Sequence, residues 1–452
     1  MPVKTDVFRD YPVKKAVLLQ IIPAVAGQMI ALVYNLADTY FVGMLDSPVA
    51  TAAVTVAYPG VLVLTALSNL FGIGGAALIA KQLGKNEFAT AKRISSISFW
   101  GGVGIGVAFS LVYALFSTSL LQMCGAKADT LQDSYLYAKW VVVYGGPFAV
   151  CNILLGNIVR SEGSSIHAAV GVSLGGILNM VLDPFFVLPG FLGYRAEGAG
   201  MATAISSMVA TGYFMGYLAF KRQNTVLSLR FSALKWTKKY IGGIFSIGLP
   251  SAIQLVLTVV SIAMQARFVS NYEITEAVAA LGIAKKLDQL PLYFSLGVVS
   301  GLLPLLAYNH SSGNIRRREQ SLHFCMMISV FFSTLCLVVY EIFAPQLVSS
   351  FINEEKTVRY GTDFLRIMVV AMPMMAFCHP LITMFQAIGK VKEALFCSIL
   401  RKGVLDIPLL FLLDSLFALY GCMFVQPIVD FISLLVALVL YRKIRRSEKK
   451  RG

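Results

Sequence analysis

Asp38 is an ionisable residue inside a long apolar stretch, where a charge costs roughly 2.5–3.5 kcal/mol on membrane-insertion scales. It occurs in the segment NLADTYFVG, and Tyr34 and Asn35 precede it by four and three residues. In a helix, this spacing places the three side chains on one face. Apolar surroundings disfavour the charged form of an aspartate, which suits a carrier that takes up and releases protons. The same oxygens, with neighbouring carbonyls and amides, could hold Na⁺ instead, and a hydrogen bond in helix packing is the alternative.

Asp183 is a second candidate of this kind, in the segment NMVLDPFFV. Asn179 precedes it by four residues, so the amide and the carboxylate lie one above the other on a helix. Pro184 has no N–H donor and disrupts a helix, which would leave the carbonyl of Met180 available as a ligand. The alternative is that the Asp-Pro pair only marks a kink near one end of the helix.

The second half of the chain contains ionisable residues of both signs in its apolar stretches. They are Lys285, Lys286, Asp288, Arg401, Lys402, Asp406 and Asp430. Lys285 and Asp288 form either an internally compensated pair or an ionic gate or substrate contact in a cleft. Asp406 follows Lys402 by four residues, a spacing typical of an ion pair on a helix.

The elements that must position these residues are membrane-spanning helices. The 452 residues are 57% hydrophobic and 13% charged, with a mean hydropathy of +0.74, whereas soluble domains carry about 25% charge. A span takes about 20 residues. The apolar stretches predict an all-α polytopic membrane protein with spans near residues 14–44, 49–80, 92–122, 131–158, 163–190, 196–220, 239–270, 275–308, 315–345, 357–388, 390–413 and 417–441.

The net charge of +15 could indicate nucleic-acid binding, but its distribution indicates membrane topology instead. Basic residues concentrate in alternate connecting segments, beginning with the N-terminal tail and ending with the C-terminal tail, and acidic residues dilute them in the other segments. The positive-inside rule then predicts a plasma-membrane protein with an even number of spans and both termini in the cytoplasm. No nucleic-acid partner is expected.

An internal repeat accounts for the whole length. Pro250 follows Pro23 by 227 residues, and Gly389 follows Gly163 by 226. Six spans per copy make the two copies parallel, which predicts two six-helix bundles around a central cleft that alternates its access between the two sides. The predicted units are an N-terminal lobe over residues 1–220, a cytoplasmic linker over 221–239 and a C-terminal lobe over 240–452. A channel is the alternative, but no re-entrant, filter-like segment is visible.

The segments VYNLADTYFVG, AALIAKQLGKNEFATAKR, GNIVRSEGSSIHAAVGVSLGGILNMVLDPFFV and GAGMATAIS resemble the MATE family of multidrug and toxic-compound extrusion transporters, in a bacterial branch. The resemblance implies antiport of H⁺ or Na⁺ against organic compounds. It places the family's cation ligands on Asp38, Asn157, Asn179, Asp183 and Thr203. The C-terminal half departs from relatives with acidic ligands in spans 7 and 10, since span 7 has no carboxylate within the membrane and span 10 has His379 and Gln386.

The expected function is therefore secondary active export of small organic compounds, often cationic, by a monomer in the lipid bilayer. The alternative is a flippase for a lipid-linked sugar or another lipid, whose diphosphate would use the cations of the second half. An enzyme is not expected, because no aspartate cluster for Mg²⁺ is present in the loops. No cofactor and no metal is expected, apart from possible Na⁺ at Asp38 and Asp183, and Tyr34, Asn35, Lys285 and Asp288 are candidates for a cleft or gate.

Overall fold

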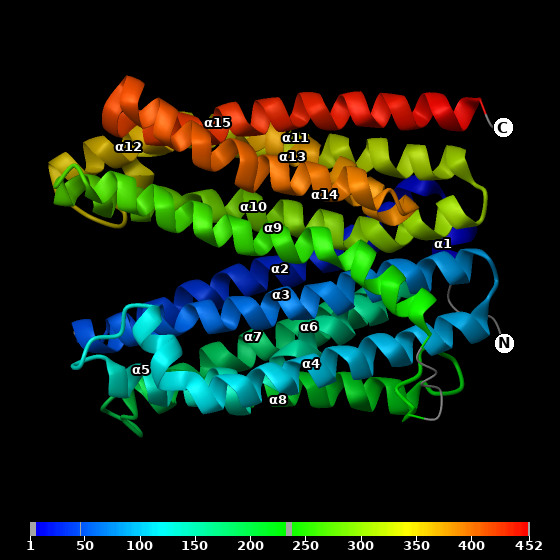
Figure 1. Ribbon diagram of the computed structural model, residues 1–452, viewed down its shortest axis with the longest axis horizontal. Coiled ribbons are helices and arrows are strands. Elements are labelled where there is room, and N and C mark those ends of the chain that lie inside the picture. The colour runs from blue at the N-terminus through cyan, green and yellow to red at the C-terminus, as the bar shows by residue number, and fades with distance from the viewer. Residues whose placement is uncertain (1–5, 46, 232–236, 451–452) are drawn as a thin grey trace.

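The computed structural model describes residues 6–45, 47–231 and 237–450, and within these ranges the chain forms helices and no strand. Long helices run side by side along the longest axis of the molecule (Figure 1). The first half contains α1 (Asp6–Arg9), α2 (Val13–Gly43), α3 (Pro48–Gly84), α4 (Phe88–Met123), α5 (Leu131–Ala138), a π-helix (Lys139–Tyr144), α6 (Gly146–Ser161), α7 (Ser165–Val187) and α8 (Arg195–Phe220).

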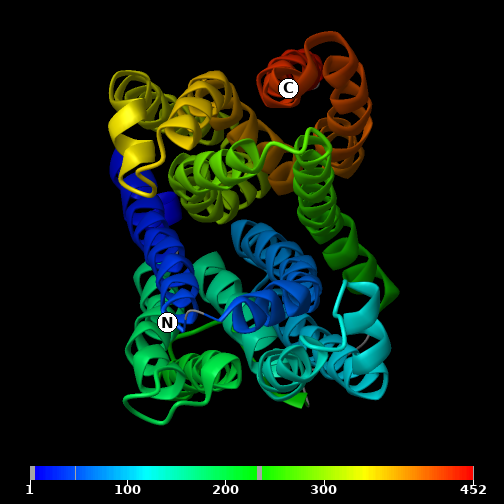
Figure 2. The same cartoon turned by 90° about the vertical axis from the view of Figure 1, so that its left-hand side faces the viewer.

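The second half repeats this order. It contains α9 (Lys238–Ser270), α10 (Thr275–Ser311), α11 (Ile315–Ser349), α12 (Glu355–Val369), α13 (Met372–Ile388), α14 (Val391–Ile399), a second π-helix (Leu400–Leu405) and α15 (Asp406–Lys449). Viewed along the helices, the two halves form two groups, which we call the N-lobe and the C-lobe (Figure 2). The all-helical, two-lobe architecture predicted from the sequence is confirmed.

The twelve predicted spans can be traced through these helices. Within the described residues, eight helical stretches are long and apolar enough to cross a membrane, or ten if each bent pair is one span. Two spans are bent pairs, α5 with α6 and α12 with α13, at angles of 48° and 41°. Another continuous stretch, Val391–Glu448, contains two spans, because Ala418 has a positive φ of 51° and the chain reverses there. The remaining span, α8, is rich in Gly, Ala and Ser. The exact lobe boundaries at residues 220 and 240 stay predictions.

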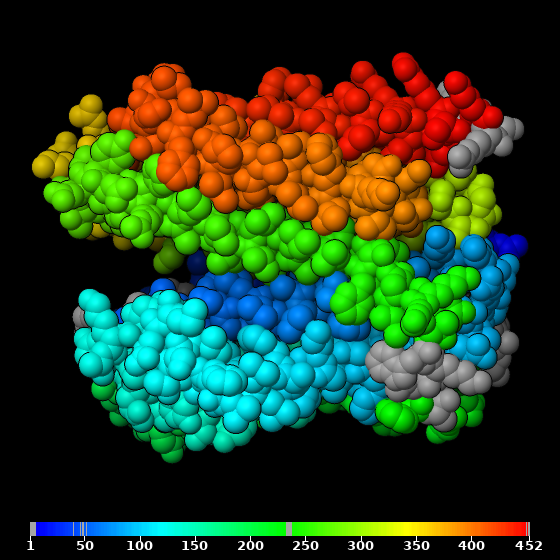
Figure 3. Space-filling view, in the orientation of Figure 1, coloured from blue at the N-terminus to red at the C-terminus, as the bar shows by residue number. Residues whose placement is uncertain are grey.

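The lobes meet closely toward the end of the molecule that carries both termini, which we call the terminal end. There α2 packs on α10 and α3 packs on α9. Glycines make the approach possible, since a Cβ atom on Gly248 would lie 1.9 Å from the carbonyl oxygen of Leu70, and one on Gly74 would lie 2.1 Å from that of Ile244. At the opposite end the molecule is hollowed between the lobes (Figure 3), so the structure is closed at the terminal end and open at the other.

Residues 225–230, between the lobes in sequence, bind to the N-lobe, and we call them the linker strap. The N–H and C=O groups of Ser228 both bond to the Ser95 hydroxyl of α4, at 2.9 and 3.2 Å. Trp100 Nε1 donates to the carbonyl of Leu229 at 2.9 Å. At the start of the strap, Thr225 donates to the Glu162 carboxylate at 2.6 Å, and burial raises the pKa of Glu162 to about 7.

A second connection joins the N-terminal segment to the C-lobe. Arg317 of α11 donates to the carbonyls of Phe8 and Tyr11 at 2.7 and 2.6 Å. Phe8 is fully buried, with its ring 5.3 Å from that of Tyr308 on α10. The guanidinium thereby supplies a donor to the Phe8 carbonyl, which the four-residue α1 leaves without an intrahelical partner.

Candidate cation-binding site

The buried polar residues of α7 and α8 form one hydrogen-bonded group in the N-lobe. Asn179 Nδ2 lies 3.3 Å from both Asp183 Oδ1 and Thr203 Oγ1, and the Thr203 hydroxyl donates to the carbonyl of Ala199 at 3.0 Å. Asp183 is fully buried and Asn179 is 3% exposed. The structure therefore brings together three of the residues that the sequence singled out.

Asp38 faces this group from α2, and we call Asp38, Asn179, Asp183 and Thr203 the N-lobe oxygen cluster. The Asp38 and Asp183 carboxylates are close enough to interact electrostatically. Three acceptor atoms, Asp38 Oδ1, Asn179 Oδ1 and Asp183 Oδ2, are buried without a hydrogen-bond partner among the described residues. Buried acceptors without donors cost free energy unless a proton, a donor or a small cation complements them.

Small residues bring α2 and α7 close enough to face these groups toward each other. A Cβ atom on Gly176 would lie 2.8 Å from the Tyr34 ring, and one on Gly27 would lie 3.7 Å from Ala169. The helix α7 runs three residues beyond Pro184, so the proline lies in its last turn.

Three other polar residues of the N-lobe bear on this site: Asn157, which was expected as a ligand, and Asn152 and Tyr137, which were not. Asn157 bonds within its own helix, donating to the carbonyl of Ile153 at 3.0 Å and accepting from Arg160 at 3.3 Å. Asn152, one turn and a half earlier, lies against α7, with its Nδ2 3.3 Å from the Cβ position of Gly175, and its Oδ1 has no partner among the described residues. Tyr137 interacts electrostatically with both Asp38 and Asp183, a proximity that depends on tertiary packing.

Asn35 lies on the boundary between the lobes. Its Nδ2 atom donates to the carbonyl of Ala31 at 2.8 Å and to the Tyr293 hydroxyl of α10 at 3.2 Å. This contact places one of the predicted gate residues between the lobes, next to the N-lobe oxygen cluster in sequence.

The charged residues of the C-lobe are largely paired with one another. Arg401 Nε lies 2.6 Å from Asp430 Oδ1, and both side chains are at least 97% buried. The same guanidinium donates to His379 Nε2 at 2.7 Å, which leaves Nδ1 to donate to Ser295 at 2.9 Å. Lys402 and Asp406 form the ion pair expected from their spacing, at 3.3 Å.

Lys285 and Asp288 do not contact each other directly. Gln426 lies between them, accepting from the Lys285 ammonium at 3.2 Å and donating to the Asp288 carboxylate at 3.4 Å. Lys286 is exposed. Among the described residues there is no group of three or more His, Cys, Asp or Glu side chains placed to hold a metal ion.

Comparison with known proteins gives the family. The MatE family model matches this chain twice, over residues 23–185 and 250–412, which reproduces the internal repeat. The chain is 30% identical to the multidrug export protein MepA of Staphylococcus saprophyticus over 97% of its own length and 95% of that protein. It is 28% identical, with the same coverage, to MepA of Staphylococcus aureus.

Solved structures share the fold over the full length of both chains. An outward-facing multidrug resistance MATE transporter superposes with a TM-score of 0.93 at 23% identity. A MOP superfamily transporter from Pyrococcus furiosus superposes with a TM-score of 0.92, also at 23% identity. Two lobes, a repeated family match and full-length relatives agree: this chain belongs to the MatE family, whose members are transporters and not enzymes, and it is a multi-pass membrane protein.

Proposed function

We propose that this protein is a secondary active multidrug exporter that exchanges small organic compounds, often cations, for H⁺ or Na⁺. The proposal that export is the activity follows from the family and from relatives that are multidrug export proteins. The proposal that an ion drives it rests on one observation, the unpartnered buried oxygens of the N-lobe oxygen cluster. We favour the proton, because one proton supplies the donor that an unpartnered carboxylate oxygen lacks.

The cluster contains two carboxylates that repel each other and, beside them, a fixed set of hydrogen-bond donors. This combination allows it to couple an ion to transport. Protonating either Asp38 or Asp183 removes that repulsion and supplies a donor to an acceptor that has none. A positively charged compound in the cleft would stabilise the ionised carboxylates instead. Ion and compound would therefore bind in alternation, as antiport requires.

Alternating access is supported by the asymmetry between the two ends of the molecule. Contacts between α3 and α9 close the terminal end, and the opposite end is hollowed (Figure 3). With both termini in the cytoplasm, as the basic segments predict, this structure represents the state open to the outside of the plasma membrane.

A lipid flippase is less well supported, because its diphosphate would need free cations in the C-lobe. Arg401 and Lys402 instead hold carboxylates at 2.6 and 3.3 Å. Lys285 bonds to the amide oxygen of Gln426.

The test is transport in proteoliposomes, following a fluorescent organic cation under an imposed pH gradient or Na⁺ gradient in turn. Wild type should move the dye under one of the gradients, which names the ion. Asp38→Asn and Asp183→Asn should each lower gradient-driven transport at least about tenfold, since each removes an ionisable group from the cluster. The matched control is Asp363→Asn, a carboxylate that accepts from Tyr420 at 3.0 Å, away from the cluster, and it should transport as wild type does. Normal, gradient-dependent transport by both cluster variants would contradict the proposal.

A further inference from the structure

The C-lobe contains a polar cluster on the same three spans as the N-lobe oxygen cluster. In the N-lobe these are the first, fifth and sixth spans, α2, α7 and α8. In the C-lobe the corresponding spans contribute Ser261 from α9, the pair Lys402 and Asp406, and Gln426 from α15. We call these four residues the C-lobe cluster.

The fifth span carries the same arrangement in both lobes. In each, a polar residue precedes an aspartate by four positions and a proline follows it closely, as Asn179, Asp183 and Pro184 in one and Lys402, Asp406 and Pro408 in the other. Asp406 follows Asp183 by 223 residues, against 226 or 227 for the anchors of the repeat. It therefore lies about one helical turn nearer the start of its span.

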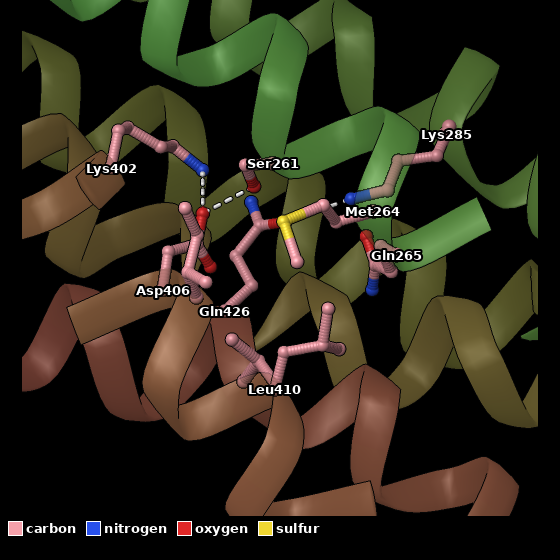
Figure 4. Close-up of a pocket in the computed structure, with 10 residues that line it drawn as sticks. Ser261, Met264, Gln265, Lys285, Lys402, Asp406, Leu410 and Gln426 are labelled. Atoms are coloured by element: carbon pink, nitrogen blue, oxygen red, sulfur yellow. Dashed lines mark hydrogen bonds and ion pairs between the residues drawn. The ribbon is translucent and has the colours of Figure 1, made fainter. Parts of the chain in front are cut away.

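The two clusters differ in what their carboxylates contact. The Lys402 ammonium lies 3.3 Å from Asp406 Oδ2, and the Ser261 hydroxyl donates to the same oxygen. Both groups point at the Asp406 carboxylate in Figure 4. The side chains of Lys402 and Asp406 are 13% and 7% exposed. In the N-lobe the residue four positions before the aspartate is the neutral Asn179, and Asp183 Oδ2 has no partner among the described residues.

We propose that the C-lobe cluster is a second cation site in which the ammonium of Lys402 serves as a permanently tethered ion. It follows that replacing Lys402 by asparagine, the residue type of the N-lobe, opens a site for one monovalent cation at Asp406. This inference rests on the proposed function of the N-lobe oxygen cluster for its choice of ion. It explains why a carboxylate and an ammonium are both retained within the membrane, where either alone is costly.

The surroundings suit an ion of that size. A cavity of about 10 Å³ adjoins Ser261, Lys402 and Asp406, which is room for about one water molecule or a small cation and not for an organic compound. Of the other charges nearby, Arg401 is paired with Asp430, and the Asp288 carboxylate accepts from the neutral Gln426. The Lys285 ammonium also bonds only to Gln426 among the described residues, so it could move to Asp406.

The experiment counts bound cations on the purified full chain, without using transport. The background is Asp38→Asn/Asp183→Asn, which removes both N-lobe carboxylates. Na⁺ binding is measured by calorimetry against choline chloride, and proton binding by potentiometric titration between pH 5 and 9. Adding Lys402→Asn should raise the count by one Na⁺ or one proton per chain. Lys402→Arg, which keeps a tethered cation, should leave the count unchanged.

Two further variants keep the result decisive. Lys402→Met removes the ammonium at nearly constant length and should add one proton per chain, and thermal melting establishes that each variant is folded. The Lys402→Asn chain is also made with Lys285→Gln, so that Lys285 cannot replace the lost ammonium. The proposal is supported if Lys402→Asn adds one cation per chain, either with Lys285 present or with Lys285→Gln. It is overturned if neither of these two chains gains a cation. Normal transport by the Asp38→Asn/Asp183→Asn chain would contradict the proposed function instead. The cation count does not depend on any transport measurement.

Discussion

The closure of the terminal end depends on the absence of a side chain at Gly248. A Cβ atom there would lie 1.9 Å from the carbonyl oxygen of Leu70, against 3.4 Å for ordinary contact, so Gly248→Ala must separate α3 from α9 by about 1.5 Å. Overpacking of this kind costs about 1–3 kcal/mol. In an equilibrium between two lobe arrangements, that cost lowers the population of the state closed at the terminal end by about 5- to 150-fold.

The populations can be measured by the distance between spin labels at the open end. Leu192 and Phe351 lie in exposed loops of the N-lobe and C-lobe, at 57% and 50% exposure, and each can be replaced by a labelled cysteine after the seven native cysteines are removed. Gly248→Ala should shift the distribution toward the shorter distance, because in the proposed alternating access the opening of the terminal end closes the other end.

Gly242 supplies a matched control on the same helix. A Cβ atom at this position meets nothing within 4 Å, so Gly242→Ala makes the same change in helix propensity without the clash. It should give the wild-type distribution. If Gly248→Ala gave that distribution as well, the close approach of α3 and α9 would not control the lobe equilibrium, and the reasoning would be refuted.

Three further predictions concern the linker strap, the N-terminal segment and the C-lobe ion pair. Because folding raises the pKa of Glu162 from 4.5 to about 7, this residue contributes stability that is present below about pH 4.5 and is lost as the pH rises through 7. Glu162→Gln should remove up to about 3 kcal/mol of that pH dependence, measured as melting temperature against pH. Arg317→Ala should release the N-terminal segment and speed trypsin cleavage at the exposed Arg9 several-fold, followed by mass spectrometry. Asp430→Asn leaves Arg401 buried without its carboxylate and should cost about 3–5 kcal/mol, whereas Arg401→Met/Asp430→Leu should melt closer to wild type.

The spans could be predicted from the sequence because hydrophobic length and the repeat are local or periodic signals. The predicted span at 14–44 compares with α2 at Val13–Gly43, and that at 239–270 with α9 at Lys238–Ser270. The two π-helices and the bends at α5–α6 and α12–α13 could not be predicted in this way. They change the path of a helix without changing its apolar composition.

In the candidate site too, contacts along one helix could be predicted from the sequence, and contacts between distant segments could not. Asn179 with Asp183 and Lys402 with Asp406 follow from spacing along one helix, and both pairs are in contact. The bonds from Asn35 to Tyr293 and from Arg317 to Phe8 of α1 join residues 258 and 309 positions apart. No local pattern in the sequence indicates such pairs.

The binding of the linker strap to α4 shortens the segment of chain that connects the two lobes. The Arg230 carbonyl accepts from Ser96 of α4, and the next residue, Phe231, packs on Trp100. From Arg230 to Lys238, the first residue of α9, the chain has eight peptide units. Fully extended, they reach roughly 28 Å. If the lobes separate at the terminal end, as the proposed function requires, this length of chain limits how far they can move. A cut in the segment would remove that limit and an insertion would raise it, without touching a residue of either cluster.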